Sequence, residues 1–227
     1  MFRKHCRWLL PLLLLLCVAP FTAPLDLAIS RYFYTQPPEG QFSEHPFFLF
    51  IYLYGAWPGL LIAMGACLVF CLSFYLEKLK KWRSSALLLI LTCLIGAGLI
   101  THAILKDHWG RPRPKQIAEF GGQLAFHPFY QPHFAPQIEK TKSFPSGHTS
   151  MGFYFLTFVL LGTQLKNRSL IGFGVAGTLF LGSALSLTRI AQGGHFFSDV
   201  LLSALIMWWS ALSINWFLLR RSHERLN

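Results

Sequence analysis

Six long apolar runs constrain the fold of this chain more than any other feature of its sequence. They cover approximately residues 8–29, 46–76, 86–105, 148–165, 169–190 and 199–219. Each is close to the roughly 20 residues that an α-helix needs to cross a hydrocarbon layer about 30 Å thick. In lipid, backbone groups must be hydrogen-bonded within a helix or a closed barrel, and these uninterrupted runs lack the alternation of barrel strands. The sequence therefore predicts an all-α bundle of six transmembrane helices, with residues 1–227 forming a single integral membrane domain.

The composition excludes an ordinary soluble domain. Hydrophobic residues make up 53% of the chain and charged residues only 13%, and the mean hydropathy is +0.44. These values are typical of proteins whose surface faces lipid. The run at 46–76 is long enough to be tilted, or kinked at Pro58, because a proline ring removes one hydrogen bond from a helix.

The distribution of basic residues predicts the orientation in the membrane. Twelve of the twenty Lys and Arg residues flank the runs in four clusters: Arg3, Lys4 and Arg7; Lys78, Lys80, Lys81 and Arg83; Lys166 and Arg168; Arg220, Arg221 and Arg225. With six spans, all four clusters lie on one face, which the positive-inside rule makes cytoplasmic. We expect a multi-pass membrane protein with both termini in the cytoplasm. The net charge of +11 then reflects topology and attraction to anionic lipids, and it does not indicate nucleic-acid binding.

The N-terminal run has a second interpretation. A basic start, a Leu-rich stretch and small residues near positions 19–23 also describe a secretory signal peptide. Cleavage there would leave five spans and would place the new N-terminus outside. An uncleaved first helix is the favoured interpretation, and the mass of the intact purified protein distinguishes the two.

Unusual polar residues occur where the predicted helices meet the outer face. This set comprises Lys106, Arg111 and Arg113 after the third run, Ser146, Gly147 and His148 at the start of the fourth, Arg189 at the end of the fifth, and His195 and Asp199 at the start of the sixth. Each has an ordinary explanation when taken alone, such as an interfacial lysine or a helix-starting turn. Their common location on one face of the bundle indicates a site.

The set predicts chemistry on an anionic substrate. Cationic side chains and a helix N-terminus stabilise a phosphoryl group, and two histidines can act as nucleophile and acid. His195 and Asp199 are four residues apart, so a carboxylate can orient the imidazole. The outer acidic residues, Asp26, Glu39, Glu44, Asp107, Glu119, Glu139 and Asp199, are mostly far apart in sequence. We therefore expect no metal and no cofactor.

Three spaced motifs resemble those of the type 2 phosphatidic acid phosphatase superfamily. The first is a Lys, six residues and Arg-Pro, matched by Lys106 and Arg113-Pro114; the second is Pro-Ser-Gly-His at 145–148. The third is Ser-Arg, five residues, His, three residues and Asp, matched by Arg189, His195 and Asp199, with Thr188 in place of Ser. Membrane members of this superfamily dephosphorylate lipids, and soluble relatives include acid phosphatases and vanadium haloperoxidases.

The resemblance implies a role for each matching residue. His195 would attack phosphorus and form a phosphohistidine, with Asp199 orienting it, and His148 would protonate the leaving oxygen. Lys106, Arg113, Arg189, Ser146 and the backbone of Gly147 would bind the phosphate oxygens. The family pattern gives His108 and Arg111 no fixed role, and both are predicted as possible headgroup contacts.

The substrate is predicted as a class only. The region around GRPRP and the FGG sequence at 120–122 is similar to bacterial lipid A 1-phosphatases and to phosphatidylglycerophosphate and undecaprenyl diphosphate phosphatases. The loop aromatics Phe126, Phe129, Tyr130 and Phe134 either guide a lipid headgroup or pack the loop. The partners we expect are the lipid phosphate and membrane lipids, with no obligate protein partner. Alternatives are a lipid phosphotransferase, a haloperoxidase, and a transporter or other lipid-phosphate binder without enzymatic activity.

Overall fold

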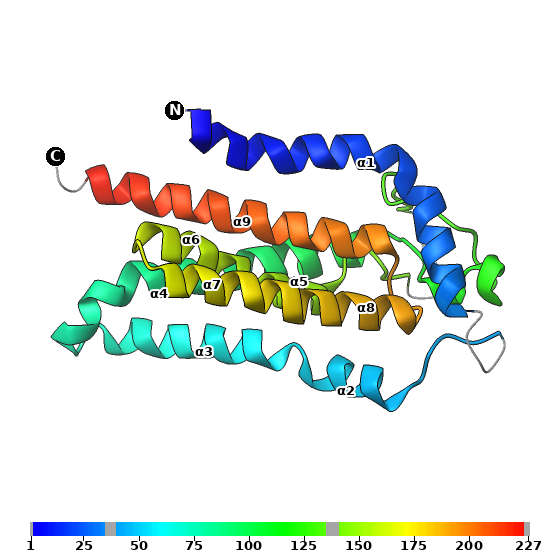
Figure 1. The fold of residues 1–227 in the computed structure, drawn as a ribbon, viewed down its shortest axis with the longest axis horizontal. Coiled ribbons are helices and arrows are strands. Elements are labelled where there is room, and N and C mark those ends of the chain that lie inside the picture. The colour runs from blue at the N-terminus through cyan, green and yellow to red at the C-terminus, as the bar shows by residue number, and fades with distance from the viewer. Residues whose placement is uncertain (1, 35–39, 135–140, 225–227) are drawn as a thin grey trace.

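The computed structural model is a bundle of long helices (Figure 1). It describes residues 2–34, 40–134 and 141–224, without the side chains of residues 2–7, 10 and 220–224. The helices are α1 (Phe2–Tyr34), α2 (Pro46–Tyr54), α3 (Trp57–Leu72), α4 (Arg83–Leu91), α5 (Gly147–Phe153), α6 (Leu156–Gln164), α7 (Arg168–Gly177), α8 (Ser183–Ala191) and α9 (Phe197–Glu224). Two π-helices, η2 (Thr92–Lys106) and η5 (Thr178–Gly182), and three 3₁₀-helices, η1 (Glu77–Trp82), η3 (Pro114–Gln116) and η4 (Ala118–Phe120), complete the described elements. The all-α prediction is confirmed.

Five helical segments are long and apolar enough to cross a membrane. They are Pro11–Tyr34, Pro46–Leu72, Glu77–Lys106, Arg168–Ala191 and Phe197–Leu219. The fourth predicted run, 148–165, is divided into α5 and α6. At the division, Thr157 N donates to the carbonyl of Tyr154 and Phe158 N to that of Phe155, so the backbone tightens to i→i+3 bonding. The prediction of six spans is therefore approximate, because this run is not one continuous helix.

The second predicted run, 46–76, is interrupted just before Pro58. α2 ends at Tyr54 and α3 begins at Trp57, which places Pro58 in the first turn of α3. A proline fits there because its missing N–H would have no partner within the helix. Gly55 lies at the break, and a Cβ atom on it would lie 2.6 Å from the carbonyl oxygen of Ile51.

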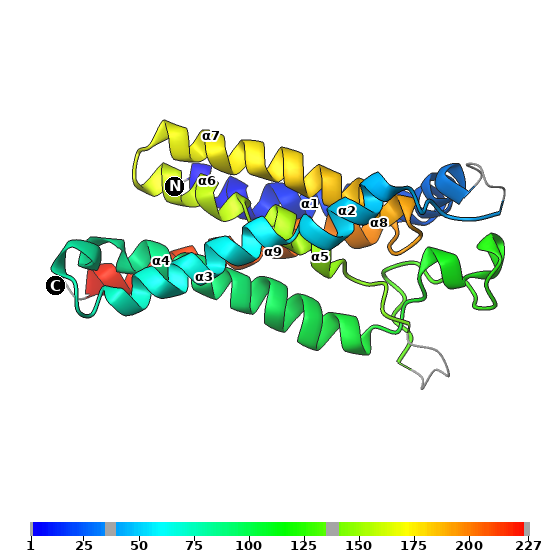
Figure 2. The same ribbon diagram turned by 90° about the horizontal axis from the view of Figure 1, so that it is seen from below.

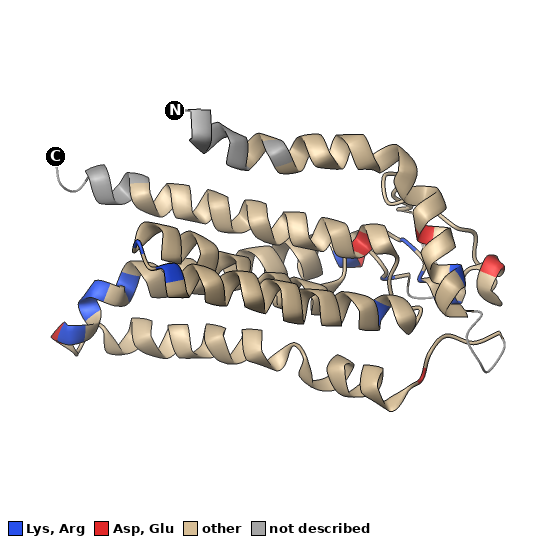
Figure 3. Ribbon diagram, viewed as in Figure 1, with Lys and Arg blue, Asp and Glu red and all other residues tan. Residues whose placement is uncertain are grey.

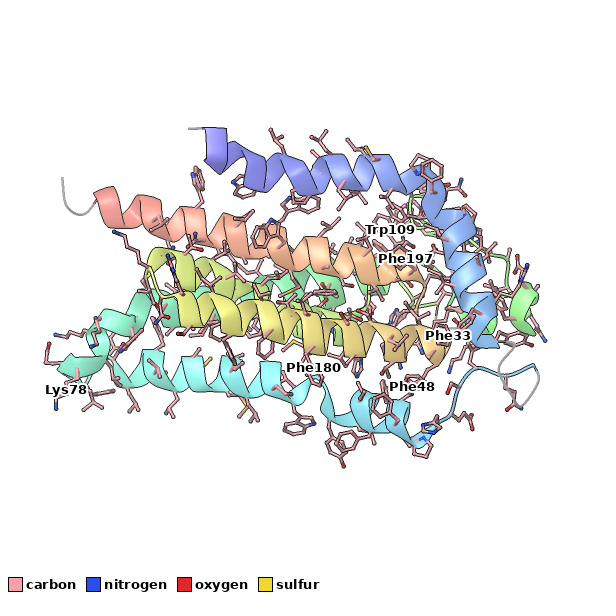
Figure 4. All side chains as sticks on the ribbon, in the orientation of Figure 1. Phe33, Phe48, Lys78, Trp109, Phe180 and Phe197 are labelled. Atoms are coloured by element: carbon pink, nitrogen blue, oxygen red, sulfur yellow. The ribbon has the colours of Figure 1, made fainter. Side chains whose placement is uncertain are left out.

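The exterior is apolar and much of the interior is polar. Phe180 is 75% exposed and projects from the side of the bundle (Figure 4), and Phe21 is 64% exposed. The hydroxyls of Thr92, Thr101 and Ser203 are fully or almost fully enclosed between helices. This arrangement suits a protein whose solvent is the hydrocarbon of a bilayer.

The two ends of the bundle differ in charge and in structure. The end where α1 begins and α9 ends carries Lys78, Lys80, Lys81, Arg83, Lys166 and Arg168 (Figure 3). The long loop between η2 and α5 extends from the opposite end (Figure 2). The other predicted flanking residues, Arg3, Lys4, Arg7, Arg220, Arg221 and Arg225, lie outside the described side chains.

Helix α1 changes direction along its length (Figure 1). It contains Pro11, Pro20 and Pro24, and prolines inside a helix cause kinks. Its first part runs beside α9, and its last part crosses the loop-bearing end of the bundle (Figure 1). The bend brings residues of α1 to the start of α9.

Helix α5 crosses η5 through two glycines. A Cβ atom on Gly152 would lie 2.7 Å from Gly182 Cα, and its other near neighbours are also backbone atoms. Gly172, on the exposed side of α7, has no atom within 4 Å of such a Cβ. The close approach of the two backbones therefore requires glycine at position 152. No such contact requires glycine at position 172.

We expect Gly152→Ala to lower stability by about 1–3 kcal/mol, because the backbone on both sides of the contact must move. Gly172→Ala is the matched control and should be neutral or stabilising by up to about 1 kcal/mol, since alanine favours a helix. Thermal unfolding in detergent measures both. Equal melting temperatures for the two variants would contradict this account of the α5–η5 crossing.

Candidate active site

The structure brings the predicted polar residues to the loop-bearing end of the bundle. Lys106 ends η2; Arg111 and Arg113 follow it in the loop; Ser146, Gly147 and His148 start α5; Arg189 lies in the last turn of α8; His195 lies between α8 and α9; and Asp199 lies in the first turn of α9. Residues separated by more than 90 positions in sequence therefore share one end of the molecule.

His195 is buried and its ring has a defined tautomer. Its Nδ1 lies 2.5 Å from the carbonyl oxygen of Ser143. A carbonyl can only accept, so Nδ1 carries the proton and Nε2 keeps a free lone pair. The Asp199 carboxylate lies 3.6 Å from the same nitrogen. The expected carboxylate thus lies next to the ring, but the direct hydrogen-bond acceptor is a backbone carbonyl that the sequence did not reveal.

The environment keeps His195 neutral. Burial lowers its pKa to about 3, and the nearby Asp199 only partly opposes this effect. A neutral imidazole with an unprotonated Nε2 is the form required of a nucleophile near pH 7.

Tyr52 of α2 connects two of the predicted residues. Its ring stacks on His148 with centroids 4.6 Å apart, and the guanidinium of Arg189 lies 4.6 Å from the centroid of the same ring. A Cβ atom on Gly194 would lie 2.2 Å from Arg189 Nη2, so the guanidinium packs against the backbone next to His195. Arg189 therefore lies between the two histidine-bearing segments.

Three cations lie in this region, and none of them forms an ion pair with a carboxylate of the described residues. Lys106 interacts electrostatically with both Arg113 and Arg189. The Nε atoms of Arg113 and Arg189 are buried and have no hydrogen-bond partner, whereas Arg189 Nη1 donates to Gln192. Both arginines line a cavity of about 650 Å³, together with Tyr52 and the segment 40–44. Buried guanidinium donors without acceptors are suited to an oxyanion.

The Pro-Ser-Gly-His segment is held tightly at the start of α5. Ser146 N donates to Ser203 Oγ, and its hydroxyl pairs with Thr149 Oγ1 at 2.6 Å. A Cβ atom on Gly147 would lie 2.3 Å from the ring of His102, so only glycine fits beside this third histidine. The Ser146 hydroxyl and N–H are therefore engaged within the protein, which differs from the expectation that they face phosphate.

Arg111 is not a headgroup contact. It is only 1% exposed and donates to Asp26, Asp199, Ser198 and the carbonyl of His127. All of these acceptors lie inside the protein. His108 is exposed, and its Nδ1 lies 2.8 Å from the carbonyl of Ile104. The prediction for Arg111 was wrong because GRPRP alone does not indicate which arginine turns inward.

The loop aromatics divide between the two predicted roles. Phe126 stacks edge-on against Phe196, and Phe129 is buried against Phe144, so both pack the loop. Tyr130 and Phe134 are 47% and 72% exposed and remain available to an interface. Phe120, the first residue of FGG, is buried against Tyr34 and Phe42. Two of the predicted acidic residues, Glu39 and Glu139, lie outside the described part of the chain.

Comparison with known proteins identifies the family. The model of the PAP2 superfamily matches residues 86–222, which contain all nine residues of the predicted set. The chain belongs to the PAP2 superfamily. This confirms the resemblance inferred from the three motifs.

The relatives of this PAP2 protein include several named lipid phosphatases. A lipid A 4′-phosphatase of Francisella tularensis subsp. novicida is 33% identical over 81% of this chain and 82% of its own length. A lipid A 4′-phosphatase of Rhizobium leguminosarum is 35% identical over 54% of this chain and 48% of its own, and a lipid A 1-phosphatase of Rhizobium etli is 32% identical over 54% and 46%. No solved structure matches. The predicted enzyme class, a lipid phosphatase, agrees with these relatives.

We expect Tyr52→Leu to lower kcat/KM for a lipid phosphate about 10-fold, because it removes the ring that supports both His148 and Arg189. Tyr52→Phe is the matched control and should retain near wild-type activity, since the ring contacts survive. Release of inorganic phosphate measures both. An equal loss in the two variants would show that the hydroxyl matters and that the stacking does not.

Proposed function

We propose that this protein removes a phosphate group from lipid A or a similar bacterial lipid phosphate, without a metal ion, through a phosphohistidine on His195. One observation carries the proposal. Within the described part of the chain, the buried Nε atoms of Arg113 and Arg189 have no acceptor, and both residues line one cavity whose wall includes Gly194, the residue before His195. A phosphate there would satisfy both guanidinium groups and would lie beside the proposed nucleophile.

In the first step, His195 Nε2 attacks phosphorus and the bond to the lipid oxygen breaks. Burial and the nearby cations lower the pKa of His148 to about 4, so His148 takes a proton from the bound phosphate monoanion and gives it to that oxygen. The lipid then leaves as an alcohol, or as a monophosphate if the substrate is a diphosphate. Lys106, Arg113 and Arg189 stabilise the charge on the nonbridging oxygens as the transition state forms. Three cations provide this stabilisation without a metal ion.

In the second step, a water molecule attacks the phosphohistidine. His148 accepts a proton from the water, the P–N bond breaks, and inorganic phosphate leaves. His195 returns to its neutral form, with Nδ1–H still donated to the carbonyl of Ser143. The backbone acceptor preserves the same tautomer throughout the cycle.

The charge distribution supports a site on the periplasmic face of the inner membrane. The basic residues Lys78, Lys80, Lys81, Arg83, Lys166 and Arg168 lie at the end of the bundle opposite the site (Figure 3). Under the positive-inside rule that end is cytoplasmic, so the site faces the periplasm.

The cavity supports a lipid whose phosphate is attached to a sizeable polar headgroup. Beyond the two arginines its lining combines polar residues with apolar ones: Gln41, Ser43, Glu44, Lys115 and Gln192, and Phe42, Leu49 and Phe120. About 650 Å³ exceeds the space that a phosphate group alone requires. The relatives named lipid A phosphatases fit this substrate class.

We expect the purified protein to release phosphate from lipid A and related lipid phosphates equally well with and without chelator.

His195→Ala should abolish turnover, because it removes the nucleophile, while leaving the protein folded in membranes. His133→Ala removes a histidine of the loop between η2 and α5 that has no proposed role, and it should retain activity. Near wild-type release by His195→Ala would contradict the mechanism.

Transfer of label to a second lipid would show a phosphotransferase, and lipid binding without release of phosphate would show a transporter or binder.

We expect His148→Ala to lower kcat/KM about 10²- to 10⁴-fold for an alkyl lipid phosphate, because the leaving alkoxide then lacks a proton donor. An aryl phosphate with an acidic phenol needs no protonation, so its first step should be much less affected. Single-turnover rates for the two substrates measure the difference. Equal losses would argue against His148 as the general acid.

A further inference from the structure

Asp26 of α1 lies in the same buried cluster as the proposed catalytic pair. It is fully buried. Its Oδ1 accepts from Ser198 N at 2.8 Å, and its Oδ2 accepts from Ser198 Oγ at 2.6 Å and from Arg111 Nη2 at 2.8 Å. In each of these hydrogen bonds Asp26 is the acceptor, as expected of an ionised carboxylate.

Arg111 holds Asp26 and Asp199 at the same time. Its Nη1 donates to Asp199 Oδ1 at 2.5 Å and its Nη2 to Asp26 Oδ2 at 2.8 Å. Phe196 covers the guanidinium at 4.4 Å from the ring centroid. The guanidinium is therefore fixed in position by two carboxylates and an aromatic face.

The cluster reaches His195 through Ser143. Ser143 N donates to the carbonyl of Arg111, Ser143 Oγ donates to Asp199 Oδ2 at 2.6 Å, and the Ser143 carbonyl lies 2.5 Å from His195 Nδ1. A shift of Arg111 would move both Asp199 and Ser143, which are the two groups nearest to Nδ1.

The charges of the cluster matter as much as its geometry. Two carboxylates and one guanidinium carry a net charge of −1, next to an imidazole that becomes positive when it attacks phosphorus. Without Asp26, Arg111 would neutralise Asp199, and the cluster would have no net charge to offset that imidazolium. In a buried site such a change strongly affects the energy of a developing charge.

We propose that Asp26 and Arg111 are positioning residues for phosphohistidine formation, with Asp26 holding the guanidinium so that Asp199 and Ser143 orient His195 and favour its positive charge. This inference depends on the proposed phosphohistidine mechanism. It assigns the first helix a role in catalysis, although α1 lies outside the matched PAP2 region.

The competing explanation is that Asp26 only stabilises the fold by capping the start of α9 through Ser198 N. The two explanations differ in a measurable way. A positioning residue changes the rate of phosphohistidine formation in every folded molecule. A purely structural residue changes the fraction of molecules that are active and leaves the rate of the active ones unchanged.

The test is single-turnover transfer of label to the full-length protein from lipid A labelled in its phosphate groups, with acid quenching avoided. Phosphohistidine and the inorganic phosphate released by its hydrolysis are counted together, so the amplitude does not depend on the rate of hydrolysis. We expect Asp26→Asn to lower the rate of labelling at least about 10-fold at unchanged final amplitude, because the reacting atoms are misplaced. Ser30→Ala is the control. Ser30 is buried on the same helix four residues later, its hydroxyl has no hydrogen-bond partner, and both rate and amplitude should match wild type.

Ser198→Ala gives a second, milder variant in case Asp26→Asn does not fold. It removes the hydroxyl that bridges Asp26 and Arg111 but keeps both charges. We expect a roughly 3-fold lower rate at full amplitude. An unchanged rate in the folded variants, with or without a loss of amplitude, would overturn the inference. Absence of phosphohistidine in the wild-type protein would instead overturn the proposed mechanism.

Discussion

The buried ion pairs of Arg111 are the interaction on which the arrangement of this end of the molecule depends. A guanidinium that is 1% exposed is tolerated only when its donors and charge are satisfied, and here α1 and α9 each supply a carboxylate. These ion pairs form only if Arg111 packs against both α1 and the start of α9. Removing Arg111 would leave two buried carboxylates without a counter-charge, and removing Asp26 would take away the acceptor of Arg111 Nη2.

The GRPRP sequence shows how two neighbouring arginines come to differ in role. Arg111 and Arg113 are two residues apart and each precedes a proline, yet their side chains have different surroundings. The first has internal acceptors for its donors, whereas the second has a buried Nε without one. The proposed mechanism uses this difference, with Arg111 next to the groups that contact His195 and Arg113 as a ligand of the phosphate.

Much of the fold and of the site follows from the sequence, for identifiable reasons. Apolar run lengths predict the helices, and Pro58 predicts the interruption in the second run. Motif spacing predicts a common location for Lys106, His148 and His195 because alternating spans return to the same face.

Other features depend on the tertiary fold. The break within 148–165 has no proline or glycine pair to mark it, since Tyr154 and Phe155 occupy it. Tyr52 is one of many aromatics in an apolar run, and Ser143 acts through its backbone, so neither has a distinctive sequence signal. Asp26 offered one weak signal, a carboxylate within a membrane helix, which is costly unless it has a function.

The Ser143 carbonyl has a consequence for how the site can vary. Every amino acid at position 143 carries a carbonyl, so a change of side chain there leaves the acceptor for the His195 ring in place. The proton on His195 Nδ1 therefore keeps its acceptor when the side chain at position 143 changes. The hydrogen bond from the Ser143 hydroxyl to Asp199 can be lost or altered separately. Relatives could thus exchange this residue and adjust the strength of the carboxylate without changing which ring nitrogen faces the phosphate.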